Sequence, residues 1–545
     1  MHGPQIQRKW KNRKNNLKLK LNLKLKEKHK PCCCCKCKFL SPFSFFYFPF
    51  SSSSFSIPIP NLNPKSPNRS PSSPTESAYT HGSQTSSKTH PPPPSFSAAP
   101  TQPTRSSPAT PPWSNISSRP TSLIIRKRRH FPWALTDFLG HGIFNVGVDS
   151  WKFQRQVSSH KFNTKSLRKF VETVVDTELS DRLIPILSSA TKQGTVLDFQ
   201  DILQRFAFDN ICKIAFGFDP AYLFPSLPQA KLALAFEDGV RYSSERFDAL
   251  LPVIWKIKKL LNIGSEKRLR IAVSEIREFA MKIINEKKQE LGEKQSLDSV
   301  DLLSRFLSSG HSDENFVIDI VISFILAGRD TTSAALTWFF WLLSKNPEIE
   351  SEILKEIYEK SEAPIYDEVK DMVYTHASLC ESMRLYPPVP IDTKEAVNDD
   401  ELPGGTVVKK GMRVSYFPYA MGRLETLWGS EWAEFKLERW LQKEEENSNL
   451  KSSSWKFVGR DSYTYPVFQA GPRICLGKDM AFLQMKRVVA VVLRRFKVMP
   501  AFEQGVHHEP EYMYYLTSKM KGGFPVKIME RDHHLWSREW VMSID

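Results

Sequence analysis

Cysteine is scarce over most of this chain of 545 residues. Five of the eight cysteines crowd together within residues 32–37, and the other three, Cys212, Cys380 and Cys475, lie far apart. Three scattered cysteines do not form the paired framework of a disulfide-rich secreted domain, which favours a reducing compartment. The crowded five lack paired Cys-x-x-Cys modules and histidine partners at zinc-finger spacing, so we interpret them as low-complexity sequence rather than a metal or acylation site.

Acidic residues are nearly absent from residues 1–133, which hold 22 of the 76 Lys and Arg residues but only two of the 59 Asp and Glu residues. The net charge of +17 at pH 7 therefore comes from this segment, and residues 134–545 are close to neutral. A body without a basic surplus gives no support for binding DNA or RNA, so we expect no nucleic-acid partner.

Residues 1–133 also lack a hydrophobic run long enough to span a membrane. The apolar stretch Phe39–Phe50 is about 12 residues long and is interrupted by Pro42 and Pro49, whereas a spanning helix needs about 20 residues. No secretory cleavage site is present, and shallow attachment to a membrane surface stays open. Residues 51–122 are dominated by Ser, Pro and Thr, so we expect a disordered leader over 1–133.

Periodic apolar sequence begins near Ala134, and we expect one folded domain over 134–545. The patterns predict a fold that is mainly α with a minor β-sheet. The expected helices cover Lys165–Ser180, Phe199–Phe216, Ser265–Gly292 and Ala481–Phe496, and the expected strands lie in Gly405–Val414 and in a pair over Leu516–Ile528 that turns at Gly522-Gly523.

The longest apolar stretch, Phe316–Ser344, has the hydropathy of a membrane-spanning helix. Its centre contains Arg329 and Asp330, which are costly in lipid, so we expect a helix through the core of a large domain instead. Asp330 and Thr331 place an acid beside a hydroxyl, a combination suited to delivering protons. Gly328 lacks a Cβ and leaves room for a small ligand beside them.

A loop near the C-terminus places Cys475 between Gly471 and Gly477. A thiolate is a soft ligand for iron, and glycines allow a flat macrocycle to approach the backbone closely. Arg473 can pair with a carboxylate of such a ligand, and Phe468 can shield the sulfur from water. Taken alone, the same cysteine could equally be buried in an aromatic-rich turn.

Two further charged motifs suit either a buried site or a solvated surface. Trp151 and Arg155 share one face of a helix at i,i+4, and Glu381 and Arg384 form an i,i+3 pair flanked by apolar residues. A third charge, Arg439, lies in another aromatic-rich stretch. Taken alone, each motif could be exposed and of little energetic value.

The loop from Phe468 to Gly477 resembles the haem-binding signature of the cytochromes P-450, Phe-x-x-Gly-x-Arg-x-Cys-x-Gly, with every specified position filled. Ala327–Thr332 is similar to the oxygen-activating helix of that superfamily. The resemblance implies a cytochrome P-450 fold that binds haem (iron protoporphyrin IX), with Cys475 as the iron ligand. It also implies that the Trp-x-x-x-Arg helix contacts the haem propionates and that a buried Glu-Arg-Arg network supports the cysteine loop. The implied cofactor-binding residues are Trp151, Arg155, Gly328, Phe468, Gly471, Arg473, Cys475 and Gly477, the proton-handling residues are Asp330 and Thr331, and the structural network is Glu381, Arg384 and Arg439.

Longer stretches narrow the resemblance to one plant group. Residues 151–160, 419–423 and 468–482 look like those of fatty-acid ω-hydroxylases and of relatives that oxidise jasmonoyl-isoleucine. The resemblance implies hydroxylation of a lipophilic small molecule, using O₂ and NADPH through NADPH-cytochrome P-450 reductase, at the cytosolic face of the endoplasmic reticulum membrane. The alternatives are a jasmonoyl-isoleucine 12-hydroxylase or oxidase, an isomerase or dehydratase of P-450 type, which the Asp330-Thr331 pair disfavours, and an inactive product.

Family analogy also suggests where substrate would lie and where this chain departs from the pattern. The substrate-lining segments would be Ile320–Ala327, Val389–Thr393 and Leu516–Met520. Leu437 stands where the family usually has proline, and because this change removes a φ restraint but no charge, we expect a modest effect on stability.

The resemblance begins near Leu135. The family's membrane helix, proline-rich hinge, first sheet and first two helices are not readable before that point, so a membrane surface is expected but its anchor is not recognisable. Residues 117–127 are what the codons for the group's usual sequence at this position can encode when they are read one base late. We therefore expect that much of 32–133 is an out-of-frame translation, with the frame restored near 133–135; the alternative is a genuine disordered extension.

Overall fold

The computed structural model describes most of the chain between Pro132 and Arg531 and one short piece before it. The described residues are 125–126, 132–159, 162, 164–227, 231–247, 249, 251–293, 301–309, 313–362, 364–396, 398–402, 405–443, 455–502 and 509–531. The expectations for the leader, including the out-of-frame reading of 32–133, lie outside these residues apart from 125–126 and 132–133. Strand β1 (Ile125–Arg126) pairs with a later strand, β3 (Asp392–Ala396).

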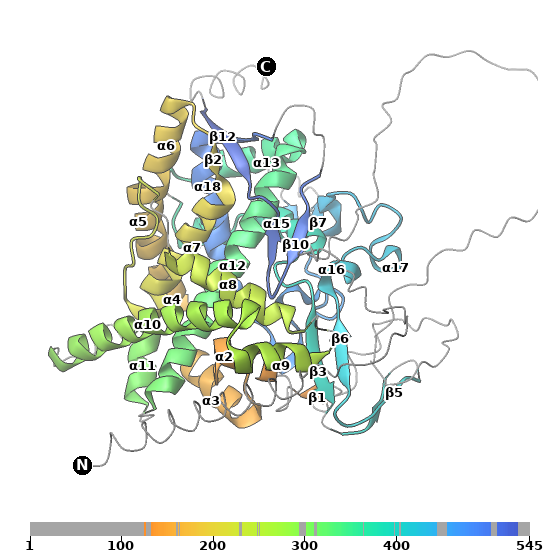
Figure 1. Ribbon diagram of the computed structural model, residues 1–545. Coiled ribbons are helices and arrows are strands. Elements are labelled where there is room, and N and C mark those ends of the chain that lie inside the picture. The colour runs from red at the N-terminus through yellow and green to blue at the C-terminus, as the bar shows by residue number, and fades with distance from the viewer. Residues whose placement is uncertain are drawn as a thin grey trace, which may run out of the picture. The chain divides into compact units, whose positions relative to one another are not determined.

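Helices dominate the described chain (Figure 1), and the expected fold class, mainly α with a minor β component, is confirmed. The α-helices are α2 (Pro132–Leu139), α3 (Val148–Ser159), α4 (Thr164–Lys169), α5 (Asp176–Glu178), α6 (Ile184–Gln193), α7 (Phe199–Phe216), α8 (Lys231–Glu245), α9 (Pro252–Leu261), α10 (Gly264–Glu293), α11 (Leu302–Ser308), α12 (Glu314–Ser344), α13 (Pro347–Tyr358), α14 (Tyr366–Lys370), α15 (Val373–Leu385), α16 (Pro418–Met421), α17 (Glu425–Trp428) and α18 (Lys478–Arg495). The π-helical turns are η3 (Phe170–Val175) and η4 (Leu179–Leu183), and the 3₁₀ turns are η5 (Leu437–Arg439), η6 (Pro466–Phe468) and η7 (Gly471–Arg473).

Helix α7 has the bounds that the sequence predicts, because both of its ends carry strong local signals. The Asp198 side chain accepts hydrogen bonds from the backbone N–H groups of Gln200 and Asp201, which caps the N-terminus. Gly217 adopts a left-handed conformation with φ of 64° and ends the helix. The helix expected over Lys165–Ser180 is present: α4, η3, α5 and η4 follow one another without a gap, the junctions on both sides of α5 and before α6 keep right-handed helical φ and ψ, and the helix continues into α6.

Helix α12 runs through the interior of the domain, as expected for Phe316–Ser344. Asp313 caps its first turn by accepting from Asn315 N–H, and most of its 31 residues are buried. Its first half packs in one hydrophobic cluster with α2, α7, α8, α10 and α11, and its second half packs in another with α13, α15 and α18. Ala327 to Thr331 therefore lie where the two clusters meet. Among the described residues, no helix is long and apolar enough to cross a membrane.

The strands form small antiparallel sheets, and their bounds are β1 (Ile125–Arg126), β2 (Leu197–Asp198), β3 (Asp392–Ala396), β4 (Asp400–Glu401), β5 (Val407–Val408), β6 (Arg413–Tyr416), β7 (Leu441–Lys443), β8 (Trp455–Phe457), β9 (Phe496–Pro500), β10 (Tyr512–Tyr514), β11 (Ser518–Met520) and β12 (Pro525–Glu530). Two sheets have three strands, in the orders β1-β3-β6 and β2-β12-β9, and three further pairs are β4-β5, β7-β8 and β10-β11. Asp392 pairs with Tyr416 in the first sheet, which sets the register beside the cysteine loop.

The expectation that Leu516–Ile528 forms one strand pair is wrong. Strands β11 and β12 lie there, with Gly522-Gly523 between them, but β11 pairs with β10 and β12 pairs with β9 and β2. The chain changes sheets at the glycines because Asp198 holds the next residue: Phe524 N–H donates to Asp198 Oδ1 at 2.9 Å. A Cβ on Gly523 would overlap the same carboxylate.

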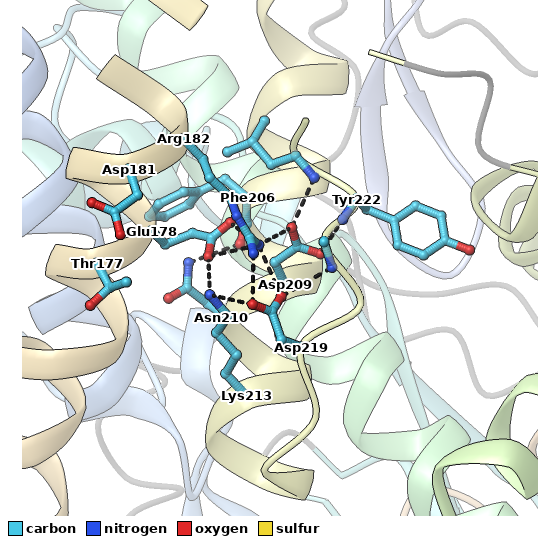
Figure 2. A network of polar contacts seen from close by, with 12 residues as sticks. Thr177, Glu178, Asp181, Arg182, Phe206, Asp209, Asn210, Lys213, Asp219 and Tyr222 are labelled. Atoms are coloured by element: carbon cyan, nitrogen blue, oxygen red, sulfur yellow. Dashed lines mark hydrogen bonds and ion pairs between the residues drawn. The ribbon is translucent and has the colours of Figure 1, made fainter. Parts of the chain in front are cut away.

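A buried ion network connects the α5–η4 segment, α7 and the loop after α7 (Figure 2). Glu178 and Asp209 are fully buried, and the side chains of Arg182, Lys213 and Asp219 point toward them. Arg182 lies 3.0 Å from Glu178, 3.2 Å from Asp209 and 2.6 Å from Asp219, and Lys213 lies 2.5 Å from Glu178. Three carboxylates thus share two cations, and we call this cluster the α7 network.

Candidate functional site

The loop that carries Cys475 is built from two 3₁₀ turns, η6 and η7, followed by the first turn of α18. Cys475 N–H donates to Phe468 O at 2.8 Å, which closes the loop. Gln469 and Gly471 both have positive φ, at 65° and 67°, so the chain turns sharply before the cysteine. A Cβ on Gly477 would lie 4.0 Å from Cys475 Sγ, an ordinary contact, so the protein's own atoms do not require glycine at that position.

Cys475 is the cysteine among the described residues that a ligand can reach. Cys212 and Cys380 are buried, whereas Cys475 is exposed. Enough protein still surrounds its thiol that desolvation raises the thiol pKa, against the opposing effects of the Gly477 N–H and the Arg155 charge. Within the described chain, no group of three or more His, Cys, Asp or Glu side chains is placed to hold a metal ion.

The structure brings Trp151, Arg155 and Arg473 together beside this loop. Arg155 Nη1 donates to Ile474 O at 2.7 Å, next to the cysteine. The guanidinium carbon of Arg473 lies 4.5 Å from the centre of the Trp151 ring, and that of Arg155 lies 5.7 Å from it. Burial lowers the pKa of Arg473 to about 10, and its Nη2 contacts Val146 O at 3.5 Å. Two guanidinium groups therefore lie close to one thiol.

A polar cluster behind the loop was missed in the sequence. Gln469 Nε2 donates to Asp392 Oδ2 at 2.8 Å, Lys394 Nζ donates to Gln469 Oε1 at 3.2 Å, and Tyr416 Oη also bonds to Gln469 Oε1. These bonds fix Gln469, the residue that adopts positive φ before the cysteine. The alternation of Asp392 and Lys394 along one strand was the signal, because residues at i and i+2 share one face of a strand.

The candidate proton-handling residues lie in the middle of α12. Thr331 Oγ1 donates to Ala327 O one turn earlier at 2.6 Å. Asp330 is buried, and its Oδ1 lies 2.8 Å from Nη1 of the neighbouring Arg329. Arg329 Nη2 in turn lies 3.5 Å from Gln204 Oε1 on α7. The acid and the hydroxyl are adjacent in the chain, but each already has a partner.

Gly328 does not have the role expected from the sequence. A Cβ at this position would lie 2.6 Å from Ile211 Cγ1, so the space left by the missing side chain is filled by Ile211 of α7. The glycine therefore allows α7 and α12 to pack closely, rather than leaving a hole for a small ligand.

Glu381, Arg384 and Arg439 also meet, although not equally closely. Glu381 and Arg384 are fully buried on α15 and form two bonds, at 2.7 and 2.8 Å. Glu381 also accepts from Trp440 Nε1 at 2.8 Å and from Lys436 N–H at 3.0 Å. Arg439 Nη1 lies 3.5 Å from Glu381 Oε1, which makes it the loosest member. We call this cluster the α15 network.

The three segments expected to line a substrate site also lie near one another. Ser518 N–H, in Leu516–Met520, donates to Pro388 O at 2.8 Å, directly before Val389–Thr393. Strand β11 packs against α12, which carries Ile320–Ala327.

Sequence comparison with known proteins identifies the family. A sequence model of the family described as "Cytochrome P450" matches residues 123–522. The chain belongs to the cytochrome P450 family. Cytochrome P450 94A1 of Vicia sativa is 65% identical over 407 residues, which is 75% of this chain and 78% of the relative. Cytochrome P450 94A2 of Vicia sativa is 65% identical over 404 residues (74% and 77%), and cytochrome P450 94B1 of Arabidopsis thaliana is 48% identical over 408 residues (74% and 78%).

Membership makes this protein a cytochrome P450 monooxygenase similar to the plant 94 group. The family uses haem, O₂ and electrons from a redox partner. The described residues fit such a cofactor, because the reachable thiol of Cys475 lies beside Arg155 and Arg473. Neither arginine forms an ion pair with a carboxylate of the described chain, so both guanidinium groups can bind the acidic groups of a haem.

Proposed function

We propose that this cytochrome P450 hydroxylates a fatty acid or a fatty-acid-derived substrate at its ω end. The observation that carries the proposal is that residues 468–482 resemble those of plant fatty-acid ω-hydroxylases in a chain 65% identical to cytochrome P450 94A1. The segment Ile320–Ala327, which family analogy places at the substrate, is apolar apart from Ser323, and this composition suits a hydrocarbon chain better than a polar substrate.

In this proposal Cys475 holds the haem iron, Trp151, Arg155 and Arg473 hold the haem carboxylates, and Phe468 shields the sulfur. The bound haem supplies the oxygen chemistry that inserts one oxygen atom into a C–H bond. The surrounding chain orients the cofactor and keeps water away from it. Phe468 packs against Phe482 of α18 with ring centres 5.2 Å apart, which fixes the ring near the cysteine.

Asp330 and Thr331 would handle protons. The Thr331 hydroxyl uses its proton to bond Ala327 O, so its oxygen stays available as an acceptor. Asp330 is paired with Arg329 inside the protein, where an isolated carboxylate would be costly. We propose that Asp330 passes protons toward Thr331 and that an intact pair favours monooxygenation over isomerase or dehydratase activity.

The test is turnover, with NADPH and a plant NADPH-cytochrome P450 reductase, by the enzyme from a gene in which the codons for about 32–133 are restored to the other frame. We expect ω-hydroxylated product from medium-chain fatty acids, seen by mass spectrometry, and no product from Cys475→Ala. Thr331→Ala should keep consuming NADPH but release more peroxide and less product. Product from jasmonoyl-isoleucine and none from fatty acids would instead establish the 12-hydroxylase or oxidase alternative.

We also propose that the enzyme works at the cytosolic face of the endoplasmic reticulum membrane. Helix α9 supports this proposal, because its exposed apolar residues are interspersed with lysines, a composition suited to an interface with anionic lipid. The exposed apolar side chains are Val253, Ile254, Ile257, Leu260 and Leu261, and the lysines are Lys256, Lys258 and Lys259. Leu260→Glu should weaken sedimentation with phosphatidylserine vesicles, and unchanged sedimentation would contradict a role for α9.

The leader remains a separate proposal. We propose that much of residues 32–133 results from out-of-frame translation, because residues 117–127 match the group's phrase read one base late. Two versions of the gene test this: one encoding this chain and one with that stretch restored to the other frame. We expect soluble, haem-loaded enzyme from the restored gene alone, whereas equal activity from both would end the hypothesis.

A further inference from the structure

Asp319 on α12 joins three parts of the fold. Its side chain is 4% exposed. Oδ1 lies 2.7 Å from Arg277 Nη1 of α10, and Oδ2 accepts from the backbone N–H of His141 at 2.7 Å, in the turn that follows α2. A carboxylate that accepts from a guanidinium and from a backbone amide forms two charge-assisted bonds, which are the strong kind.

The turn after α2 lies unusually close to α12. Gly140 has φ of 50°, and a Cβ there would overlap the carboxylate of Asp319. A Cβ on Gly142 would overlap the hydroxyl of Ser323, one helical turn further along α12. The two glycines thus allow the backbone to reach Asp319, so the contact depends on shape as well as charge.

The opposite side of the same turn is attached to α3. The carbonyl of His141 accepts from Gln154 Nε2 at 2.9 Å, and Gln154 is fully buried. The next residue is Arg155, which bonds the backbone beside Cys475. Val146, later in the turn, contacts Arg473 through its carbonyl. A continuous set of contacts therefore runs from Asp319 through His141 to α3.

We propose that Asp319 is a positioning residue, which holds the Gly140–Val146 turn so that α3 presents Trp151 and Arg155 to the Cys475 loop. The proposal rests on the proposed haem site. Asp319 itself touches neither that loop nor the cations beside it in the described contacts, so it acts through His141 and Gln154. Arg277 is 29% exposed and can be rehydrated when it loses its partner, so the consequence of losing Asp319 should be local.

The first test compares Asp319→Asn with Asp209→Asn in the haem-loaded enzyme from the restored gene. Asp209 is a matched control on α7: it is buried, it contacts one arginine, and it accepts backbone N–H bonds from Tyr222 and Leu223 at 3.0 and 2.8 Å. Each change keeps one acceptor oxygen, and at pH 8, above the pKa of about 7 of Asp209, each also removes one charge. Haem transfer to apomyoglobin should be about tenfold faster for Asp319→Asn, the size typical of losing a residue that orients a ligand, and within about twofold of the parent for Asp209→Asn.

The second test disturbs the same contact from the other side and leaves every charge in place. Gly140→Ala would push a methyl group into Asp319, whereas Gly194→Ala has the same left-handed backbone, with φ of 64°, and no atom within 4 Å of its new Cβ. Both alanines carry similar backbone strain, so their difference isolates the Asp319 contact. Gly140→Ala should speed haem transfer as Asp319→Asn does, and Gly194→Ala should not.

Hydrogen exchange supplies a measurement that needs no haem. Asp319→Asn and Gly140→Ala should raise amide exchange about tenfold over residues 139–159, whereas Asp209→Asn should raise it over 217–225. Unchanged exchange over 148–159, or equal acceleration of haem transfer by the control variants, would overturn the positioning role. If the enzyme from the restored gene binds no haem, the proposed function fails, and exchange over 148–159 still decides the role of Asp319.

Discussion

The α15 network and the α7 network are both buried, but they differ in the ratio of carboxylates to cations. In the α15 network one carboxylate, Glu381, meets Arg384 and the looser Arg439, and Arg384 also donates to the backbone carbonyls of Trp432 and Glu434 at 2.8 and 3.0 Å. In the α7 network three carboxylates share Arg182 and Lys213 (Figure 2).

The excess of carboxylates in the α7 network affects proton binding by Asp209. Burial raises the pKa of Asp209 to about 7, and the neighbouring Glu178 carboxylate adds to the rise. A surplus of buried carboxylates can be relieved by taking up a proton. The α15 network therefore specifies one geometry behind the cysteine loop, and the α7 network couples the stability of a more distant region to pH.

Arg384→Met should give the largest effect, because it leaves Glu381 charged, fully buried and without its main cation. We expect a loss of about 3–5 kcal/mol in the free energy of unfolding, measured by urea denaturation. Arg439→Met is the control in the same network: Arg439 Nη1 lies 3.5 Å from Glu381 without a hydrogen bond to it, and Glu381 keeps Arg384, so the loss should be smaller, about 1–2 kcal/mol. Equal losses from the two variants would show that Arg439 carries as much of the network as Arg384.

Arg182→Met should come next, because it removes the cation that contacts all three carboxylates of the α7 network. Arg182 is 18% exposed and Lys213 remains, so we expect a smaller loss of about 2–3 kcal/mol. Arg241→Met, which breaks an exposed pair with Glu245 on α8, should cost no more than about 0.5 kcal/mol. A loss from Arg182→Met as small as that of this control would contradict the network.

The pH dependence of the free energy of unfolding tests the α7 network through Asp209. A carboxyl pKa raised to about 7 stabilises the folded state fully below its unfolded value near 4, and this stabilisation is lost as pH rises through 7. The free energy of unfolding should therefore fall by about 2–3 kcal/mol between pH 5 and pH 8 through Asp209 alone. Subtracting the urea series of Asp209→Asn from that of the parent should reveal this fall, and two parallel series would contradict it.

Leu437→Pro should have the smallest effect. Leu437 begins η5, where the proline found in the family would fit, and the preceding Lys436 is extended, with φ of −116° and ψ of 113°, as a residue before proline requires. Leu437 is buried, so the variant loses some packing while gaining a restraint. We expect a change of less than about 1 kcal/mol in urea denaturation, and a larger loss would show that leucine packing supports the α15 network.

Features encoded by neighbouring residues could be predicted from the sequence. Glu381 and Arg384 are three residues apart on one helix, and Trp151 and Arg155 are four apart, so helical geometry alone places each pair on one face. The bounds of α7 were predictable for the same reason, since Asp198 and Gly217 flank it directly.

Features that join distant residues could not be predicted in this way. Asp319 and His141 are separated by 178 residues, and neither belongs to a recognisable pattern. Strand β11 ends before Gly522-Gly523, and the partners that hold the chain in a different sheet after these glycines, strand β9 and Asp198, are distant in sequence, Asp198 by more than 300 residues. Gly328 belongs to a family motif, so the sequence could single it out. The sequence could not predict its close packing, because the contacting residue, Ile211, lies on another helix.

The packing of Gly328 against Ile211 restricts the order in which substitutions can accumulate. A side chain at position 328 has no room while isoleucine occupies position 211, because the new Cβ would lie 2.6 Å from it. A lineage that places alanine at 328 is therefore favoured to accept a smaller residue at 211 first, because the opposite order passes through an overpacked ancestor that is less stable by about 1–3 kcal/mol. Libraries that randomise the two positions together should recover them as a covarying pair.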